Sequence, residues 1–189
     1  MDSALIVSGS DKGIDLISQM LNINGKTDIT SAKSSGEARR LTSASEYDIV
    51  VINTPLTDEF GDNLAVTITE ISASGVILIV NNEMADDISA KIENFGVLIV
   101  SKPIIRQVFM QSLKLAIASK KRILILKSEN ISLQQKIEEI RIVTRAKCVL
   151  IQYLNMTETQ AHRYIEKQAM DMRTTRQEIA QNILKTYET

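Results

Sequence analysis

Glycine and proline are absent from the last part of this chain, because neither occurs in the 86 residues from 104 to 189. Both residue types mark turns and end helices, so a long stretch without them favours helices. We expect one helix, straight or with a single kink, from Ile104 to about Leu154.

The chain also has a single cysteine, which excludes an internal disulfide and a Cys-rich metal site. Cys148 lies in the apolar run 148–151, so we expect a buried structural thiol. No apolar run approaches the ~20 residues of a membrane helix, and the first residues lack a basic segment ahead of an apolar one. We expect a cytoplasmic protein with no metal, no cofactor and no membrane partner.

Charge is unevenly distributed. Residues 1–115 carry 9 Lys and Arg against 15 Asp and Glu, a net charge of −6; residues 116–189 carry 13 against 8, a net charge of +5. The asymmetry predicts an acidic domain followed by a basic one. Two explanations for the basic part stay open, a polyanionic partner or an ordinary solvated helix surface.

Strands and helices alternate over the first 103 residues. Apolar segments predict five strands, at Ala4–Ser8, Thr27–Ala32, Tyr47–Asn53, Val76–Val80 and Val97–Val100. Such strands separated by helices indicate a parallel sheet covered on both faces. The predicted class is α/β, a flavodoxin-like doubly wound five-stranded sheet with its ligand crevice at the carboxyl ends of the strands.

The third strand ends in Asn53, and the layout around it resembles a bacterial response-regulator receiver domain. Receivers keep an aspartate there to accept a phosphoryl group, which an amide cannot do. They also place two acidic residues after the first strand to hold Mg²⁺, where this chain has Ser8 and Gly9. Val80 and Asn81 stand where receivers have Thr or Ser.

Lys102, directly before Pro103, matches the receiver lysine that contacts the phosphoryl group. We expect it to be structural and hydrogen-bonded to Asn53. The resemblance therefore implies a receiver-like domain that does not transfer phosphoryl groups. It leaves open whether the crevice senses a small ligand or a regulatory protein.

A heptad pattern lies within the long helix. Its a and d positions are Ile123, Leu126, Asn130, Leu133, Ile137, Ile140 and Thr144. A lone Asn at an a position favours register in a parallel two-stranded coiled coil, which predicts a homodimer. The alternative is a helix packed on its own domain, which Leu124 and Ile125 outside the seam would favour.

Two capping boxes follow, at 157–160 and 174–177, and open helices at about 158–172 and 175–187. With the end of the long helix they predict a three-helix bundle. We expect its core to consist of Ala146, Val149, Leu150, Ala161, Ile165, Ala169, Ile179, Ala180 and Ile183.

The spacing of small residues in this tail carries a second resemblance. The chain has the pair Ala146-Lys147, the spaced alanines Ala161 and Ala180, and the pair Ala169-Met170. Residues 136–187 in this way resemble the ANTAR domain, an RNA-binding three-helix module of bacterial antiterminators. A receiver-like domain, a coiled coil and this tail are the architecture of ANTAR response regulators.

The resemblance implies that the tail binds RNA hairpins through bases exposed in their loops. The candidates are Arg145, Lys147, His162, Arg163, Tyr164, Lys167 and Arg173. Lys147 matches the family's Ala-Lys pair, and His162 and Tyr164 are the stacking groups. Alternatively, Arg163 and Lys167 are solvated charges, and His162 fills the slot of a packed aromatic.

The predicted domains are a pseudo-receiver over residues 1–115, a coiled-coil linker over 116–135 and an ANTAR domain over 136–189. The predicted function is transcription antitermination by a homodimer that binds hairpins in nascent mRNA, without enzymatic activity. The alternative is an interaction or ligand-sensing module whose tail only dimerises.

Overall fold

Five parallel strands form the sheet of the N-terminal unit. In the computed structural model, which describes residues 2–22 and 27–187, they are β1 (Ser3–Ser8), β2 (Asp28–Ala32), β3 (Ile49–Asn53), β4 (Gly75–Asn81) and β5 (Leu98–Lys102). Their order is β2-β1-β3-β4-β5, and every neighbouring pair is parallel. The predicted flavodoxin-like sheet is therefore confirmed.

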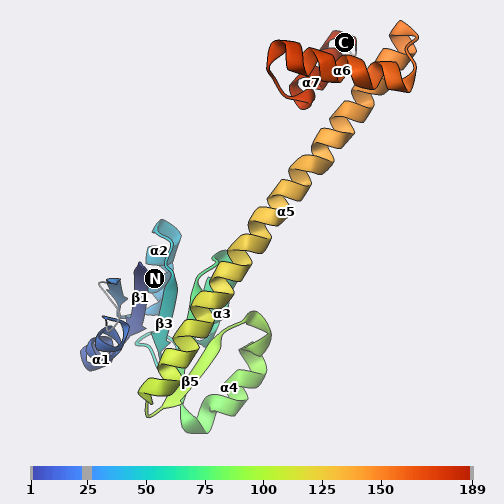
Figure 1. Ribbon diagram of the computed structural model, residues 1–189. Helices are drawn as coiled ribbons and strands as arrows, with labels where there is room; N and C mark the ends of the chain where they lie inside the picture. The colour runs from blue at the N-terminus through green and yellow to red at the C-terminus, as the bar shows by residue number, and fades with distance from the viewer. Residues whose placement is uncertain (1, 23–26, 188–189) are drawn as a thin grey trace. The chain divides into compact units, whose positions relative to one another are not determined.

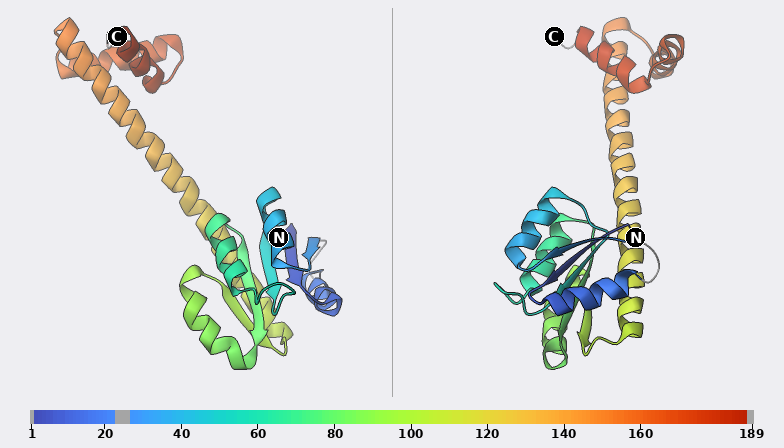
Figure 2. Two further views of the ribbon diagram at one scale, coloured as in Figure 1. Left: turned by 180° about the vertical axis from the view of Figure 1, so that it is seen from behind. Right: turned by 90° about the vertical axis from the view of Figure 1, so that its left-hand side faces the viewer.

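Helices cover both faces of this sheet (Figures 1 and 2). Helix α1 (Asp11–Leu21) and the first turns of α5 (Arg106–Leu154) pack on one face. The helices on the other face are α2 (Ser35–Ala44), α3 (Asp62–Ile71) and α4 (Ala85–Ile92). Two single 3-10 turns, η2 (Asn82–Met84) and η3 (Glu93–Phe95), flank α4.

Alternation along each strand divides the core between the two faces. In β3, Val50 and Ile52 pack against the α2–α4 side, whereas Ile49 and Val51 pack against α1 and α5. All four side chains are fully buried. A strand buried on both faces has to be apolar throughout, which is why these strands read as continuous Val, Ile and Leu runs.

Two specific contacts add to the apolar packing of α5 on the sheet. A Cβ at Gly75 would lie 2.9 Å from the Cβ of Ala116, so the helix approaches β4 as closely as a glycine allows. Lys120 donates to the Asp48 carboxylate at 2.7 Å and to the carbonyl of Tyr47 at 3.1 Å. Burial would raise the pKa of Asp48, but the Lys120 hydrogen bond, the backbone N–H groups of residues 2 and 3 and the Lys120 charge together lower it to about 2.

Helix α5 then continues without a break to residue 154, a length of 49 residues. The chain divides into two compact units, Met1–Ile125 and Leu126–Thr189. The second unit contains the remaining part of α5, α6 (Glu158–Met172) and α7 (Arg176–Tyr187). No helix among the described residues has both the length and the apolar composition needed to cross a membrane.

The core of the second unit confirms the sequence prediction. Its buried residues are Ala146, Val149, Leu150, Ala161, Ile165, Ala169, Ile179, Ala180 and Ile183. Cys148, in contrast, is exposed, so the prediction of a buried thiol was wrong. The reason is helical periodicity, because Ala146, Val149 and Leu150 share the core face and place Cys148 on another face of α5.

Capping side chains fix where α6 and α7 begin. Thr157 accepts from the Gln160 N–H, and the Gln160 side chain accepts from the Thr157 N–H, which completes the predicted capping box. The second cap lies one residue later than predicted. Thr175, not Thr174, accepts from the backbone N–H of Glu178 at 3.2 Å.

Candidate functional site

The crevice at the carboxyl ends of the strands holds an amide and a hydroxyl where receivers have carboxylates. Asn53 ends β3 and is paired in register with Ser8, the last residue of β1. Asn53 Nδ2 donates to Ser8 Oγ at 3.0 Å, and the Ser8 hydroxyl donates to the carbonyl of Ser10 at 3.2 Å. The polar groups of this crevice are thus largely engaged with one another.

Helix α1 lies directly on these two side chains. A Cβ at Gly13 would be 2.5 Å from Asn53 Nδ2 and 2.6 Å from Ser8 Oγ. Asn53 Oδ1 is buried and has no hydrogen-bond partner among the described residues, an arrangement that costs roughly 1–3 kcal/mol. The space between α1 and Asn53 has no room for an added methyl group, and a phosphoryl group is larger.

The other predicted crevice residues are dispersed. Lys102 donates to the backbone carbonyl of Thr54 and not to Asn53, and burial lowers the pKa of its ammonium group. Val80 is fully buried in the core on the α2–α4 side, and Gly9 is exposed. Lys102 therefore ties β5 to the loop after β3.

Carboxylates do not gather near this crevice. Asp11, the acidic residue that follows β1 most closely in sequence, forms an exposed ion pair with Lys33 at 2.8 Å. Over residues 2–22 and 27–187, no group of three or more His, Cys, Asp or Glu is arranged to hold a metal ion. A hard cation such as Mg²⁺ requires charged oxygens, which this crevice does not offer.

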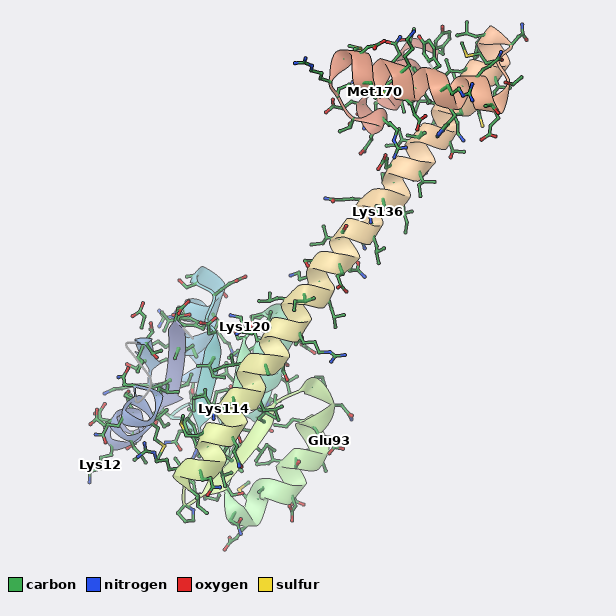
Figure 3. All side chains as sticks on the ribbon, in the orientation of Figure 1. Lys12, Glu93, Lys114, Lys120, Lys136 and Met170 are labelled. Carbon is green, nitrogen blue, oxygen red and sulfur yellow. The ribbon has the colours of Figure 1, made fainter. Side chains whose placement is uncertain are left out.

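The heptad seam of α5 is exposed along its length. Every residue from 121 to 138 is exposed, including the apolar seam residues Ile123, Leu126, Leu133 and Ile137 and also Asn130. The side chains of α5 are drawn in Figure 3. Ile140, the last apolar seam residue, is equally exposed. The apolar side chains of the seam therefore present exposed surface along α5.

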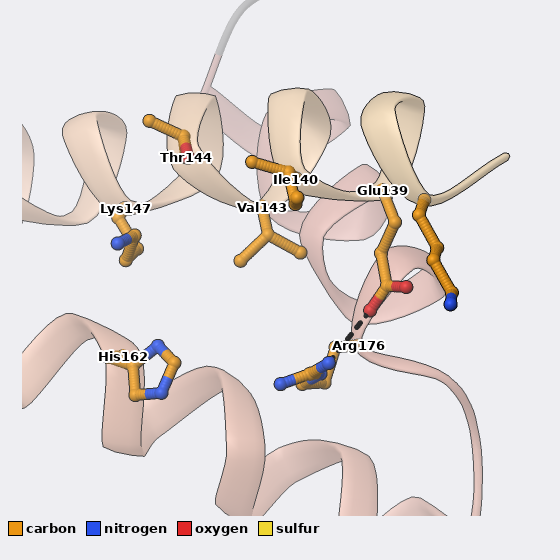
Figure 4. Close-up of a pocket in the computed structure, with 8 residues that line it drawn as sticks. Glu139, Ile140, Val143, Thr144, Lys147, His162 and Arg176 are labelled. Atoms are coloured by element: carbon orange, nitrogen blue, oxygen red, sulfur yellow. Dashed lines mark hydrogen bonds and ion pairs between the residues drawn. The ribbon is translucent and has the colours of Figure 1, made fainter. Parts of the chain in front are cut away.

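The predicted RNA-binding residues lie on different parts of the second unit. Lys147 and His162 face one another from α5 and α6 across a hollow that we call the groove (Figure 4). Arg163 and Lys167 are exposed, one helical turn apart on the outer side of α6, together with Met170, which is 74% exposed. We call these three residues the outer face of α6.

Three further candidates lie outside both surfaces. Arg145 is exposed on α5 and Tyr164 is exposed on α6. Arg173 ends α6 in a left-handed conformation, with φ of 51°, and is exposed. A non-glycine residue in this conformation carries some strain, but its N–H satisfies carbonyls of the last turn.

The groove has a volume of about 380 Å³ and lies between α5, α6 and the start of α7. Its lining consists of Lys136, Glu139, Ile140, Val143, Thr144, Lys147, His162 and Arg176. Figure 4 shows Val143 between the Lys147–His162 end and the Arg176–Glu139 end. The groove thus combines an apolar part with cations at both ends.

Carboxylates at the rim pair with most of these cations. Lys147 donates to Glu158 at 2.8 Å, and Arg176 donates to Glu139 at 3.1 Å. His162 Nε2 lies 3.2 Å from the Glu166 carboxylate. The hydrogen bond and the charge of Lys147 lower the pKa of Glu158.

Sequence reasoning missed two cations of the groove, Lys136 and Arg176. Lys136 precedes Lys147 by eleven residues, which is three helical turns, so a helix-face argument from Lys147 could have found it. Arg176 is the first residue of α7 and reaches the groove only through packing of that helix. No local signal in the sequence indicates it.

Comparisons with known proteins agree with this organisation. The family model described as the ANTAR domain matches residues 132–184. The chain is 24% identical over 170 residues to the transcriptional regulatory protein PdtaR of Mycobacterium tuberculosis strain H37Rv, covering 90% of this chain and 83% of PdtaR. The name of this relative describes a regulator of transcription.

The N-terminal unit matches solved receiver domains. One is the receiver domain of an HD domain-containing protein from Pseudomonas fluorescens Pf-5, with a TM-score of 0.57, 21% identity, and coverage of 64% of this chain and 90% of that one. Another is a response regulator receiver domain from Clostridium thermocellum, with a TM-score of 0.58, 20% identity, and coverage of 65% and 99%. The chain therefore joins a domain with the receiver fold to a C-terminal region, residues 132–184, that matches the ANTAR domain.

Proposed function

We propose that this protein is an RNA-binding regulator of transcription that acts by antitermination. In this proposal a homodimer in the cytoplasm holds two ANTAR bundles that bind hairpins in nascent mRNA and disfavour a terminator. The observation that carries the proposal is the groove on the ANTAR bundle, which combines cations with an apolar part beside a half-buried imidazole.

RNA is the partner that this chemistry fits best. Proteins read RNA mainly through unstacked loop bases, which stack on ring side chains, while Lys and Arg hold the phosphates. The groove supplies His162 and Lys147 for these two tasks. The outer face of α6 supplies exposed cations for further phosphates, and Arg145, Tyr164 and Arg173 are additional contacts in this proposal.

The exposed seam supports the proposal of a homodimer. A row of apolar side chains at a and d positions is stable in water when a second helix covers it. Asn130 at an a position favours a parallel pair in register, since the two amides then meet. A parallel pair would bring two ANTAR bundles to the same end of the coiled coil.

The receiver-like domain then works without phosphotransfer. Asn53 cannot serve as a phosphoryl acceptor, and the Ser8–Asn53 pair beneath α1 leaves no carboxylate for Mg²⁺. We infer that the signal reaches this domain as a bound protein or small ligand.

RNA recovery from cells tests the proposal. The protein is crosslinked to RNA, purified, and the bound RNA is sequenced. We expect hairpins located upstream of terminators, and increased readthrough when the purified protein is added to transcription of such a template. Arg163→Gln with Lys167→Gln should reduce readthrough, whereas Lys185→Gln, an exposed cation on α7, should not. RNA without hairpins, or unchanged readthrough, would contradict the proposal.

A further inference from the structure

We propose that the groove binds one unstacked nucleotide from the loop of the RNA, with its base against Val143 and His162 and its phosphate on Lys147 or Arg176. This inference rests on the proposed function and specifies what one part of the RNA does. It assigns a site to eight residues that lie within a single unit of the chain.

The volume of the groove limits the size of the ligand that can enter it. At about 380 Å³ it lies near the lower end of the range of about 300–1,000 Å³ that is typical of pockets for small organic molecules. A helical stem cannot enter a cavity of this size, whereas a single nucleotide can. Loop nucleotides are the ones in an RNA hairpin whose bases are free to leave the stack.

The groove has an apolar part and charged ends, which match the planar base and the charged phosphate of a nucleotide. Ile140 and Val143 of α5 give the groove an apolar part, and His162 of α6 adds a ring opposite Lys147. A planar base is accommodated by such a surface, because stacking on a ring is tolerant of base identity. Lys147 and Arg176 stand at the two ends, where either one can meet a phosphate on one side of the nucleotide.

The carboxylate on Lys147 occupies the position that a phosphate would take. Glu158 is at the start of α6, and its side chain is 72% exposed, whereas that of Lys147 is 17% exposed. Glu158 is mostly exposed and can move into water. A phosphate in its place keeps the largely buried Lys147 paired, so the exchange leaves no buried charge without a partner. Lys136, which has no ion pair among the described residues, is a further cation for the incoming RNA.

The site is tested by measuring RNA affinity after single bases are removed from the RNA, for the unmutated protein and for a variant that lacks the His162 ring. The probe is a stem-loop selected by the full-length protein from a pool with a randomised loop, and each loop position is replaced in turn by an abasic nucleotide. For the unmutated protein, we expect one position where base removal weakens binding roughly fivefold to 150-fold, the range for one base stacked on a ring. In His162→Ala the same base removal should have a much smaller effect.

Matched variants separate this site from general RNA binding. Tyr164→Ala removes a ring from the same helix outside the groove, so the penalty at that loop position should remain. Glu158→Gln should tighten binding by about twofold to fivefold, because it removes the competitor for Lys147. A second experiment replaces the phosphate beside the sensitive nucleotide by a neutral methylphosphonate. With this RNA, Lys147→Gln should no longer weaken binding, because the charge that Lys147 would contact is absent. Ile140 belongs to both the groove and the seam, so a change in the groove could also affect dimerisation. Sedimentation of each variant checks that its oligomeric state is the same as that of the unmutated protein.

The outcomes distinguish the two levels of the proposal. If a stem-loop is selected but no position couples to His162 or Lys147, the groove does not take a nucleotide, although RNA binding stands. If no stem-loop is selected, the proposed function and the nucleotide site both fail. A last experiment titrates the protein with each of the four free nucleoside monophosphates. Saturable binding in the groove without coupling to any loop position would assign it to a free nucleotide and overturn the RNA assignment.

Discussion

Ile137→Lys should convert the proposed dimer into monomers. Ile137 lies in the heptad seam and is 65% exposed in the single chain. Complete burial of an isoleucine side chain stabilises by about 1.5–3 kcal/mol. Burial of 65% of that surface in each of two helices therefore contributes about 2–4 kcal/mol to the free energy of dimerisation. Loss of this amount weakens dimerisation by about 30-fold to 700-fold, since 1.4 kcal/mol corresponds to tenfold. Two lysines facing each other across the seam would add repulsion.

Ile131→Lys is the matched control for this prediction. Ile131 is 48% exposed, lies on the same stretch of α5, and directly follows the a position Asn130, outside the seam. The substitution introduces the same charge and slightly improves helix propensity in both variants, so a folding defect is not expected from either. Sedimentation equilibrium over a range of concentrations measures both dissociation constants. An unmutated chain that is monomeric at micromolar concentrations, or equal effects of the two substitutions, would refute the reasoning.

Three further predictions concern the receiver-like domain. Lys120→Met should lower the free energy of unfolding by about 1–2 kcal/mol at pH 7, because it removes the main partner of Asp48. The pKa of Asp48 is about 2 in the folded chain against an ordinary 3.8, so this contribution is complete above pH 4 and is lost as the pH falls through 2. Denaturant unfolding of both proteins should show the difference shrinking over that range; a constant difference would exclude the ion pair as its source. Asn53→Asp should remain unphosphorylated with acetyl phosphate and Mg²⁺, and an acid-labile phosphoprotein would show that the crevice is functional. Gly13→Ala should destabilise by about 1–3 kcal/mol, because its Cβ would lie 2.5 Å from the side-chain nitrogen of Asn53, whereas Gly36→Ala, with no contact under 3.8 Å, should not; thermal melts compare them.

The sheet and the bundle core were predictable because their signals are local. Continuous apolar strands between helices indicate a parallel sheet, and the spacing of alanines and isoleucines in the tail places nine residues on core faces. Helix ends followed from capping side chains, with an error of one residue at Thr175. The sequence offers two adjacent threonines as caps, but Thr174 belongs to the end of α6, where its N–H donates to the carbonyl of Ala169.

The parts that the sequence did not predict depend on tertiary contacts. Cys148 lies in an apolar run but faces away from the core, since run composition does not specify which helix face is buried. The partner of Lys102 is the carbonyl of Thr54, whereas the Asn53 amide donates to Ser8. Arg176 enters the groove from a helix that begins almost thirty residues after Lys147.

The same limit explains why the predicted RNA-binding residues separate into distinct surfaces. Lys147 and Arg163 were grouped by charge and by resemblance, but the first is largely buried beside Glu158 and the second is exposed on the outer face of α6. Charge alone does not say whether a lysine is already paired. The two residues therefore have different environments. Arg163 can contact a phosphate directly, whereas Lys147 would first have to release the Glu158 carboxylate.

RNA binding is the central claim, and the salt dependence of hairpin affinity tests it most directly. The affinity of a selected hairpin is measured over a series of salt concentrations for the unmutated protein, Arg163→Gln and the control Lys185→Gln. We expect log affinity to fall linearly with log salt for the unmutated protein, because binding releases counterions from the phosphates. Arg163→Gln should lower the slope by about one, the value for one phosphate contact, and Lys185→Gln should leave it unchanged. A salt-independent affinity, or no measurable hairpin binding at low salt, would contradict the assignment of RNA as the partner of this ANTAR domain.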